Sequence, residues 1–420
     1  MNKIPPLIGL YEETLERLVG PPRIRAALKT LDEGAAASME LQVALCEIPA
    51  PTFKEQERAA EMVRRMKAVG LTDVSIDSIG NVIGRRPGRG NGPVLAIGAH
   101  MDTVFPEGTD VTVRREGNRY YGPGIGDDCA GLRALLETAR AFNEAGIETE
   151  GDIWFVGTVG EEGNGDIRGS KHLFNGENHI DGFLAIDNTD VGRILHSAVG
   201  SRRYRFTIKG PGGHSFAAFG RCPSAIHAAC LAGARIAHIK VPDEPKTTFT
   251  IGTIRGGTSV NTIAASCECD VDVRSLSEEA LAGVEKQVLD AFRAAVEEEN
   301  AIWGVESEDA RVHLEITKIG DRPAGVRPHE CPVIQSSRAA QKWLGIELTN
   351  YSWSSTDANM PMSLGIPSTC LSAGGVQART HTIHESFDCI DIELGPKLVF
   401  LAAALLVGAE GGVPLLPVRA

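Results

Sequence analysis

Short apolar runs alternate with amphipathic stretches along the first half of the chain. The apolar runs predict strands at residues 74–77, 81–84, 95–100, 153–159 and 182–186. Helical patterns occupy residues 36–69, interrupted at Pro49–Thr52, and a further helix is predicted from Asp128 to about Ala145. Thr52 followed by Glu55 is typical of a capping box at a helix start. This alternation indicates an α/β fold with a mixed, mostly parallel sheet flanked by helices.

The pattern changes near Ser197 and changes back near residue 320. In between, strand, helix, strand, strand, helix and strand are predicted at 204–209, 223–238, 247–254, 267–274, 278–298 and 312–319. This βαββαβ order is typical of a ferredoxin-like α+β domain. Afterwards helices are predicted at 332–344 and 394–406, with a strand at 368–372. We therefore expect a discontinuous α/β domain at 1–197 and 321–420, with an inserted domain at 198–320.

Composition narrows the classes of partner. The formal net charge of −13 over 420 residues argues against nucleic acid or an anionic membrane as a partner. No stretch approaches the roughly 20 apolar residues of a membrane span, and the N-terminal apolar run is too short for a signal-peptide core. The nine cysteines are scattered, which suits reduced thiols in a cytoplasmic protein.

Acidic and imidazole side chains recur where the predicted strands end. They are His100, Asp102, Asp127, Glu161, Glu162, Asp187 and His381. Ligands of open α/β sheets bind at the carboxyl ends of the strands, and His100 and Asp102 share one side of theirs. One such residue alone is typical of a solvated loop, but their joint occurrence favours a bound metal. Two histidines and three carboxylates serve two zinc ions when one carboxylate bridges them.

The adjacent pair Glu161–Glu162 fits two different tasks. One carboxylate can bind metal while its neighbour takes a proton from a metal-activated water.

The glycine-rich segment Gly122–Gly126 does not fit a dinucleotide loop, because no Gly-x-Gly-x-x-Gly opens a helix there. A non-catalytic metal- or peptide-binding protein on the same scaffold is the alternative from a different class.

Five short motifs occur in an order that points to one family. They are His100-Met-Asp102, Gly124-Ile-Gly-Asp127-Asp128, Gly160-Glu161-Glu162-Gly163, Ala185-Ile-Asp187 and His381-Thr-Ile-His-Glu385. With them the chain resembles the di-zinc hydrolases that include peptidase T, bacterial glutamate carboxypeptidase, aminoacylase and succinyl-diaminopimelate desuccinylase. The resemblance covers nearly the whole chain. It implies a zinc-exopeptidase-like α/β fold whose inserted domain serves dimerisation and acts as a lid.

The resemblance also implies a role for each candidate residue. The metal ligands would be His100, Asp127, Glu162, Asp187 and His381. Asp127 would bridge two Zn²⁺ ions, and Co²⁺ or Mn²⁺ could substitute in the same ligand set. Glu161 would be the general base, and Asp102 would be the carboxylate that orients His100.

Two details of the family bear on the ligand loops. Either His381 or His384 could be the final ligand from the sequence. In relatives this ligand commonly stands four residues before a glutamate, and His381 stands four before Glu385, so we choose His381. Relatives also place a cis peptide bond after the bridging aspartate, which here predicts a cis bond between Asp127 and Asp128.

The inserted domain supplies candidates for binding the substrate. In relatives a histidine in the context of Gly210-Pro-Gly-Gly-His214 reaches the active site of the partner subunit, so His214 would require a homodimer. Asn261 and Arg274 match polar positions that face the substrate, and an arginine suits the capture of a carboxylate. Gly374, with Gly375, could add main-chain N–H donors to that carboxylate.

These residues together predict a zinc-dependent hydrolase. We expect it to cleave an amide bond of a small peptide, as a di- or tripeptidase or another exopeptidase similar to peptidase T, with a metal-activated water and a glutamate base. An N-acyl-amino-acid amidohydrolase, or deacylase, on the same site is the alternative. A non-catalytic relative that binds metal or peptide is the third possibility.

Overall fold

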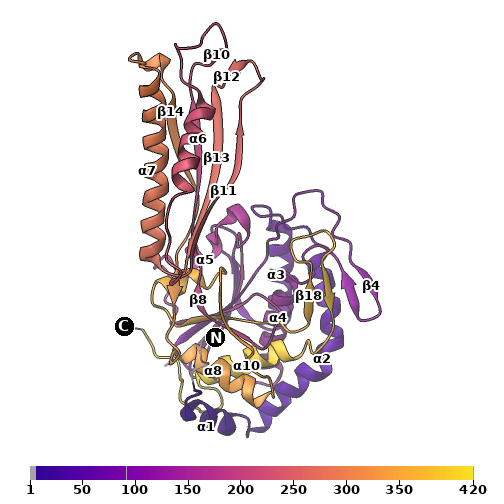
Figure 1. Ribbon diagram of the computed structural model, residues 1–420. Coiled ribbons are helices and arrows are strands. Elements are labelled where there is room, and N and C mark those ends of the chain that lie inside the picture. The colour runs from indigo at the N-terminus through magenta and orange to yellow at the C-terminus, as the bar shows by residue number, and fades with distance from the viewer. Residues whose placement is uncertain (1–5, 91, 420) are drawn as a thin grey trace. The chain divides into compact units, whose positions relative to one another are not determined.

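The structure, a computed structural model, describes residues 6–90 and 92–419. Its contacts divide the chain into two compact units. Unit one contains the residues up to Ala198 together with those from Val326 onward, and unit two is the intervening segment Val199–Gly325. Figure 1 shows the elements of each unit by their labels.

Unit one is built on a six-stranded sheet. Its strands are β1 (Thr72–Ile76), β2 (Val82–Arg86), β3 (Val94–His100), β6 (Asp152–Thr158), β7 (Gly182–Ile186) and β17 (Ser368–Leu371). The order is β1-β2-β6-β3-β7-β17; β6, β3, β7 and β17 run parallel, and β1 and β2 are an antiparallel edge. Strands β7 and β17 are buried at every position, as strands covered on both faces of a parallel sheet should be. Strand β7 is a continuous apolar run, whereas in β17 the hydroxyls of Ser368 and Thr369 donate to main-chain carbonyls. The predicted mixed, mostly parallel sheet is confirmed.

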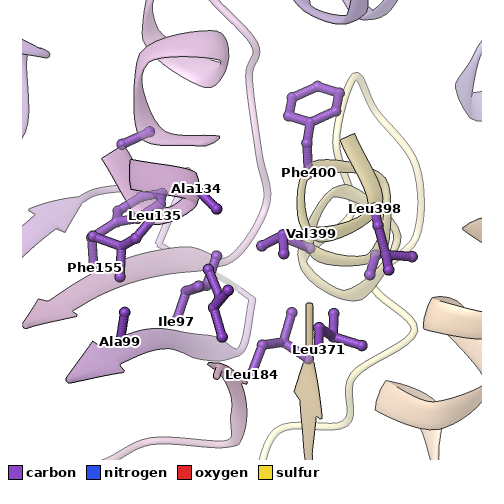
Figure 2. Packing of buried hydrophobic residues seen from close by; sticks show 14 of the residues in the cluster. Ile97, Ala99, Ala134, Leu135, Phe155, Leu184, Leu371, Leu398, Val399 and Phe400 are labelled. Atoms are coloured by element: carbon purple, nitrogen blue, oxygen red, sulfur yellow. The ribbon is translucent and has the colours of Figure 1, made fainter. Parts of the chain in front are cut away.

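Helices cover the sheet of unit one. They are α1 (Gly9–Leu18), α2 (Pro22–Cys46), α3 (Gln56–Ala68), α4 (Cys129–Glu144), α5 (Arg168–Leu173), α8 (Pro332–Trp343), α9 (Asn359–Ser363) and α10 (Leu394–Val407). Helix α10 is apolar on all sides and buried along most of its length, because it packs on the sheet and on α4 and α8. Figure 2 shows Val399 of α10 pointing toward the strands that include Ile97 of β3, and Phe400 pointing away from them. The Phe400 ring packs against Phe142 of α4. This packing holds the strand that ends at His100.

Smaller strands complete unit one. A four-stranded antiparallel sheet has the order β18-β19-β5-β4 and contains β4 (Arg114–Glu116), β5 (Arg119–Tyr121), β18 (Val376–Ala378) and β19 (Ser386–Asp388). Strands β8 (Arg193–Ala198) and β16 (Asn350–Ser354) form a parallel pair, and β15 (Gly325–Val326) lies at the boundary between the units. These strands are short and carry many polar residues, so the hydrophobic pattern did not predict them.

Unit two follows the predicted βαββαβ order. Its main elements are β9 (Gly200–Lys209), α6 (Ala225–Ile236), β11 (Thr247–Gly256), β13 (Ser266–Ser275), α7 (Glu278–Ile302) and β14 (His313–Arg322). The sheet is antiparallel with the order β11-β13-β9-β14, and a short pair, β10 (Gly213–His214) with β12 (Thr262–Ile263), stands apart from it. Burial alternates along β13, and its buried positions, including Cys267 and Cys269, pack with residues of α6 and α7. The ferredoxin-like arrangement is therefore present.

Two local predictions were wrong. Helix α2 begins at Pro22 rather than near residue 36, with proline at its first turn. Thr52 and Glu55 do not form a capping box, because α3 begins at Gln56 and has no side-chain cap. The Thr52 hydroxyl instead donates to Asp102, a residue distant in sequence.

The N-terminal apolar run begins within residues 1–5, which lie outside the described residues. Among the described helices, none is both long enough and apolar enough to cross a membrane.

Candidate metal centre

The carboxyl ends of three neighbouring parallel strands supply most of the site. His100 is the last residue of β3, Asp187 directly follows β7, and Glu161 and Glu162 lie three and four residues beyond the end of β6. Strands β6, β3 and β7 are adjacent in the sheet, so these side chains meet at one edge. Asp127 lies two residues before α4 and joins them there.

The predicted ligands form two groups of three that share Asp127. In the first group, potential ligand atoms of His100, Asp127 and Asp187 all lie within 4.8 Å of one another. In the second, the same holds for Asp127, Glu162 and His381. His100 Nε2 is 3.0 Å from one carboxylate oxygen of Asp127, and His381 Nε2 is 3.0 Å from the other. The Asp127 carboxylate is thus placed between the two histidines, one on each of its oxygens.

The donor set and its spacing fit metal ions. Imidazole and carboxylate ligands are typical of zinc sites, and ligands at about 2.0–2.2 Å from a tetrahedral ion lie roughly 3.3 Å from each other. The contacts at 3.0 Å, and that of 2.9 Å between His381 Nε2 and Glu162 Oε1, are close to this spacing. Within the described residues, neither Asp127 nor Glu162 forms an ion pair with lysine or arginine. A cation would therefore supply the compensation that these carboxylates require.

Electrostatics in the site are those of crowded carboxylates and imidazoles. Burial raises the pKa of Asp187 to about 7, which a bound cation would oppose by favouring the ionised form. Burial alone would also raise the pKa of Asp127, but its contacts with His100 and His381 bring that pKa below its ordinary value. Hydrogen bonds to the carboxylates of Asp127 and Glu162 raise the pKa of the His381 imidazole to about 10.

Glu161 lies beside the two groups. Potential ligand atoms of His100, Glu161 and Glu162 also fall within 4.8 Å of one another, and Glu161 is buried. Its neighbour Glu162 makes the contact with His381, so the two adjacent carboxylates have different surroundings. This placement suits the division of tasks expected from the sequence, with Glu162 as ligand and Glu161 as base.

Asp102 has contacts that the sequence did not predict. Its carboxylate accepts the main-chain N–H groups of Glu161 at 2.9 Å and Glu162 at 3.0 Å, and the Thr52 hydroxyl at 2.8 Å. His100 Nδ1 is 3.0 Å from the main-chain carbonyl of Asp102 but 3.7 Å from the carboxylate. The carbonyl is thus the nearer acceptor for the imidazole, and the carboxylate holds the turn that carries Glu161 and Glu162.

Asp128 and Glu385 are further buried acids that bind main chain around the site. Asp128 accepts the N–H of His100 at 3.1 Å and caps α4 through Gly131, where a Cβ would lie 2.2 Å from its carboxylate. The peptide bond between Asp127 and Asp128 is cis, as predicted. Glu385 accepts three N–H groups of the segment that ends at Asp127. The helix-start position of Asp128 was a signal for its capping, whereas Glu385 entered the sequence argument only through its spacing from His381.

Of the two candidate histidines near residue 381, the structure places His381 against the ligands. His384 is exposed, and its main-chain N–H donates to the Thr382 hydroxyl. His381 lies in the loop between β18 and β19 with a left-handed φ of 65°, a conformation that is uncommon outside glycine. Its assignment as a ligand stays a prediction, with this geometry in its favour.

Only two of the three candidate substrate-binding residues of unit two lie together. His214 in β10 and Asn261, next to β12, lie side by side because these short strands pair. Arg274 lies at the other end of β13 from that pair, and its guanidinium donates to Asp272. The structure therefore brings His214 and Asn261 together but not Arg274, and their roles toward a substrate stay predictions.

Gly374 and Gly375 follow β17 in unit one. Both have positive φ, and a Cβ on Gly375 would lie 2.1 Å from the ring of Phe387. A Cβ on Gly374 would lie 2.9 Å from the main-chain carbonyl of Asp391. Close packing thus explains both glycines without a substrate, and the proposed N–H donors stay a prediction.

Comparisons with known proteins agree with the resemblance. A sequence profile described as Peptidase family M20/M25/M40 matches residues 96–405. Carboxypeptidase G2 from Pseudomonas sp. (strain RS-16) is 33% identical over 162 residues, which are 37% of each chain. Succinyl-diaminopimelate desuccinylase from Leptothrix cholodnii is 27% identical over 52% of this chain and 61% of its own. The matches therefore span less than two thirds of these curated relatives.

Solved structures agree on the fold. The crystal structure of a tripeptidase from Staphylococcus aureus subsp. aureus mu50 superimposes with a TM-score of 0.72 at 24% identity, covering 88% of this chain and 97% of that one. At this identity the likeness shows the fold.

Proposed function

This chain belongs to Peptidase family M20/M25/M40, and from that premise we propose that it is a metal-dependent hydrolase that cleaves an amide bond in a small peptide. The observation that carries the proposal is the pair of three-residue groups sharing Asp127. A carboxylate with one imidazole on each of its oxygens suits a bridge between two ions. We propose Zn²⁺ for both positions, with Co²⁺ or Mn²⁺ as substitutes.

The residues divide the chemistry between them. His100, Asp127 and Asp187 would hold one ion, and Asp127, Glu162 and His381 the other. When bound, the ions would lower the pKa of a water molecule and polarise the substrate carbonyl. Glu161 would accept a proton from the attacking water and would deliver it to the amine nitrogen as the carbonyl carbon–nitrogen bond breaks.

His214 is oriented to donate a hydrogen bond. Its Nδ1 accepts the main-chain N–H groups of Phe216 at 3.2 Å and Ala217 at 3.4 Å. In the neutral imidazole, the proton is therefore on Nε2, which leaves that nitrogen as a donor. Such a donor suits the oxyanion that forms from the attacked carbonyl. We propose that His214 serves the active site of the partner subunit in a homodimer formed through unit two, and that Asn261 beside it contacts the same substrate. Arg274, at the other end of β13, is a separate candidate for binding a substrate carboxylate.

The alternative substrate is an N-acyl amino acid. Both substrate classes present an amide carbonyl to the same metal centre, and the curated relatives include a desuccinylase as well as a carboxypeptidase. A small peptide is favoured here because the matching profile is that of a peptidase family and a curated relative with 33% identity over the matched segment is a carboxypeptidase. We also propose a cytoplasmic location, since all nine cysteines are unpaired thiols.

Glu161→Gln tests the mechanism. The substitution removes the base but keeps the shape of the side chain, so turnover should fall by several orders of magnitude while two metal equivalents stay bound. Activity is measured on a panel of dipeptides, tripeptides and N-acyl amino acids, and metal content by elemental analysis. Substitution of the exposed Glu57→Gln on α3 is the matched control and should change neither. Retained turnover in Glu161→Gln would refute the assignment, and a fully loaded wild type inactive on the whole panel would favour a non-catalytic binding protein.

A further inference from the structure

Glu385 connects two ligand loops that are more than 250 residues apart in sequence. Its side chain is fully buried. One carboxylate oxygen accepts the main-chain N–H of Gly124 at 2.9 Å. The other accepts those of Gly126 at 2.8 Å and Asp127 at 3.0 Å. The whole carboxylate is thus used by the segment that ends at the shared ligand Asp127.

The main chain on either side of Glu385 strengthens this connection. Its carbonyl accepts the N–H of Gly122 at 3.1 Å, directly beyond the antiparallel pairing of β5 with β19. The ladder between these strands therefore continues into the side-chain contacts of Glu385. Four residues earlier in the same loop stands His381, whose Nε2 contacts the Asp127 carboxylate.

We propose that Glu385 is a positioning residue that fixes Asp127 and His381 relative to each other, and so selectively sets the affinity of the second metal position. This inference rests on the proposed dinuclear site. The position formed by Asp127, Glu162 and His381 takes two of its ligands from the loops that Glu385 joins. The position formed by His100, Asp127 and Asp187 takes only Asp127 from them. Loss of the connection should therefore weaken the second position far more than the first.

Substitution at Glu385 gives graded losses. Glutamine keeps one acceptor oxygen, which can serve Gly126 and Asp127, but it turns an NH₂ group toward the N–H of Gly124. Alanine removes all three contacts. Glu385→Gln should lower the affinity for the second ion by about 10–100-fold, the range typical of residues that orient metal ligands, and Glu385→Ala by more.

Asp388→Asn is the matched control. Asp388 is the last residue of β19, the strand that directly follows Glu385, and its carboxylate pairs with the exposed Arg119 of β5 at 2.6 and 2.7 Å. The change from carboxylate to amide is the same, and it weakens the same pair of strands without touching either ligand loop. We expect this variant to bind both ions as the wild type does.

The experiment is a titration of metal-free protein with Co²⁺, followed by visible absorption and by calorimetry, with thermal unfolding recorded for each variant. The proposal expects two binding steps in the wild type and in Asp388→Asn, and in Glu385→Gln a second step that is weakened far more than the first. A purely structural role would lower the unfolding temperature and leave the ratio of the two affinities unchanged.

Each remaining outcome would overturn the proposal in a distinct way. If the wild type shows two binding steps and Glu385→Gln binds both ions with the wild-type affinities, the role of Glu385 is refuted and the dinuclear site stands. Equal weakening of both steps would refute its selectivity. Fewer than two equivalents in the wild type would overturn the dinuclear site itself, and the role of Glu385 with it.

Discussion

Asp102→Asn separates the two roles that a carboxylate at this position can have. If the carboxylate chiefly orients His100, the substitution should weaken metal binding. If it chiefly holds the turn of Glu161 and Glu162, the metals should stay and the position of the base should suffer. The distances favour the second role, because the carboxylate is 2.9 and 3.0 Å from those two N–H groups and 3.7 Å from the imidazole.

The magnitude follows from the hydrogen bonds. Asparagine has one acceptor oxygen, and that oxygen is best placed where it serves both Glu162 N–H and the Thr52 hydroxyl. The NH₂ group then faces the N–H of Glu161, so a buried bond to a charged acceptor is lost. Such bonds contribute about 1.5–3 kcal/mol. If most of this is expressed in the placement of Glu161, kcat falls about 10–100-fold.

The assay compares kcat and metal content for wild type, Asp102→Asn and Thr52→Val on the best substrate of the panel. Thr52→Val removes only the hydroxyl donor and leaves both main-chain contacts of the carboxylate, so kcat should stay within about threefold of wild type. An Asp102→Asn enzyme with wild-type kcat would refute the reasoning. Loss of one metal equivalent in that variant would show that the carboxylate acts through His100.

Two further predictions concern stability, both measured by urea unfolding. Phe400→Ala should lower the free energy of unfolding by about 3–5 kcal/mol, because this fully buried ring packs 4.5 Å from that of Phe142, whereas the exposed Leu364→Ala should change it little. Burial lowers the pKa of His196 to about 4 from its usual 6.5, so the folded state favours the neutral ring and its contribution is lost as the pH falls from 6.5 to 4. Relative to His196→Asn, the wild type should lose about 1–2 kcal/mol over this range, a value reduced for the partial exposure of the ring, and a constant difference would contradict the shift.

Hydrophobic pattern sufficed for the elements that build the core. Strands such as β3 and β7 are continuous apolar runs, and the alternation along β13 separates a buried from a polar face. The same pattern did not predict β8 or β16, because short strands with few apolar positions resemble loops in sequence. The start of α2 was placed too late although its first turns carry a helical signal, since Ile24, Ala27, Leu28 and Leu31 recur at helical spacing and are buried.

The clustering of the candidate ligands was predictable for a different reason. Side chains such as His100 and Asp187 stand at strand ends, and the topology of a parallel sheet brings strand ends to one edge whatever the loops do. His381 needed the family spacing, since it lies in a loop between two short strands that the pattern does not predict. The contacts of His381 with Asp127 and Glu162 follow from that loop, which no local rule describes.

The acids that bind main chain around the ligands could not be predicted from residue types. Asp102 and Glu385 act on N–H groups, which every residue except proline offers, so their partners have no signature in the sequence. The prediction for Thr52 failed because it used local spacing alone. Its spacing from Glu55 fits a helix cap, but its hydroxyl donates to the carboxylate of Asp102, 50 residues away. Burying a carboxylate costs free energy unless hydrogen bonds compensate for the lost water, and here two main-chain N–H groups bind Asp102 and three bind Glu385. These bonds fix the turn of Glu161 and Glu162 and the segment that ends at Asp127. Mutagenesis of this site should therefore begin with the acids that contact main chain, because their effects separate the assembly of the metal centre from its chemistry.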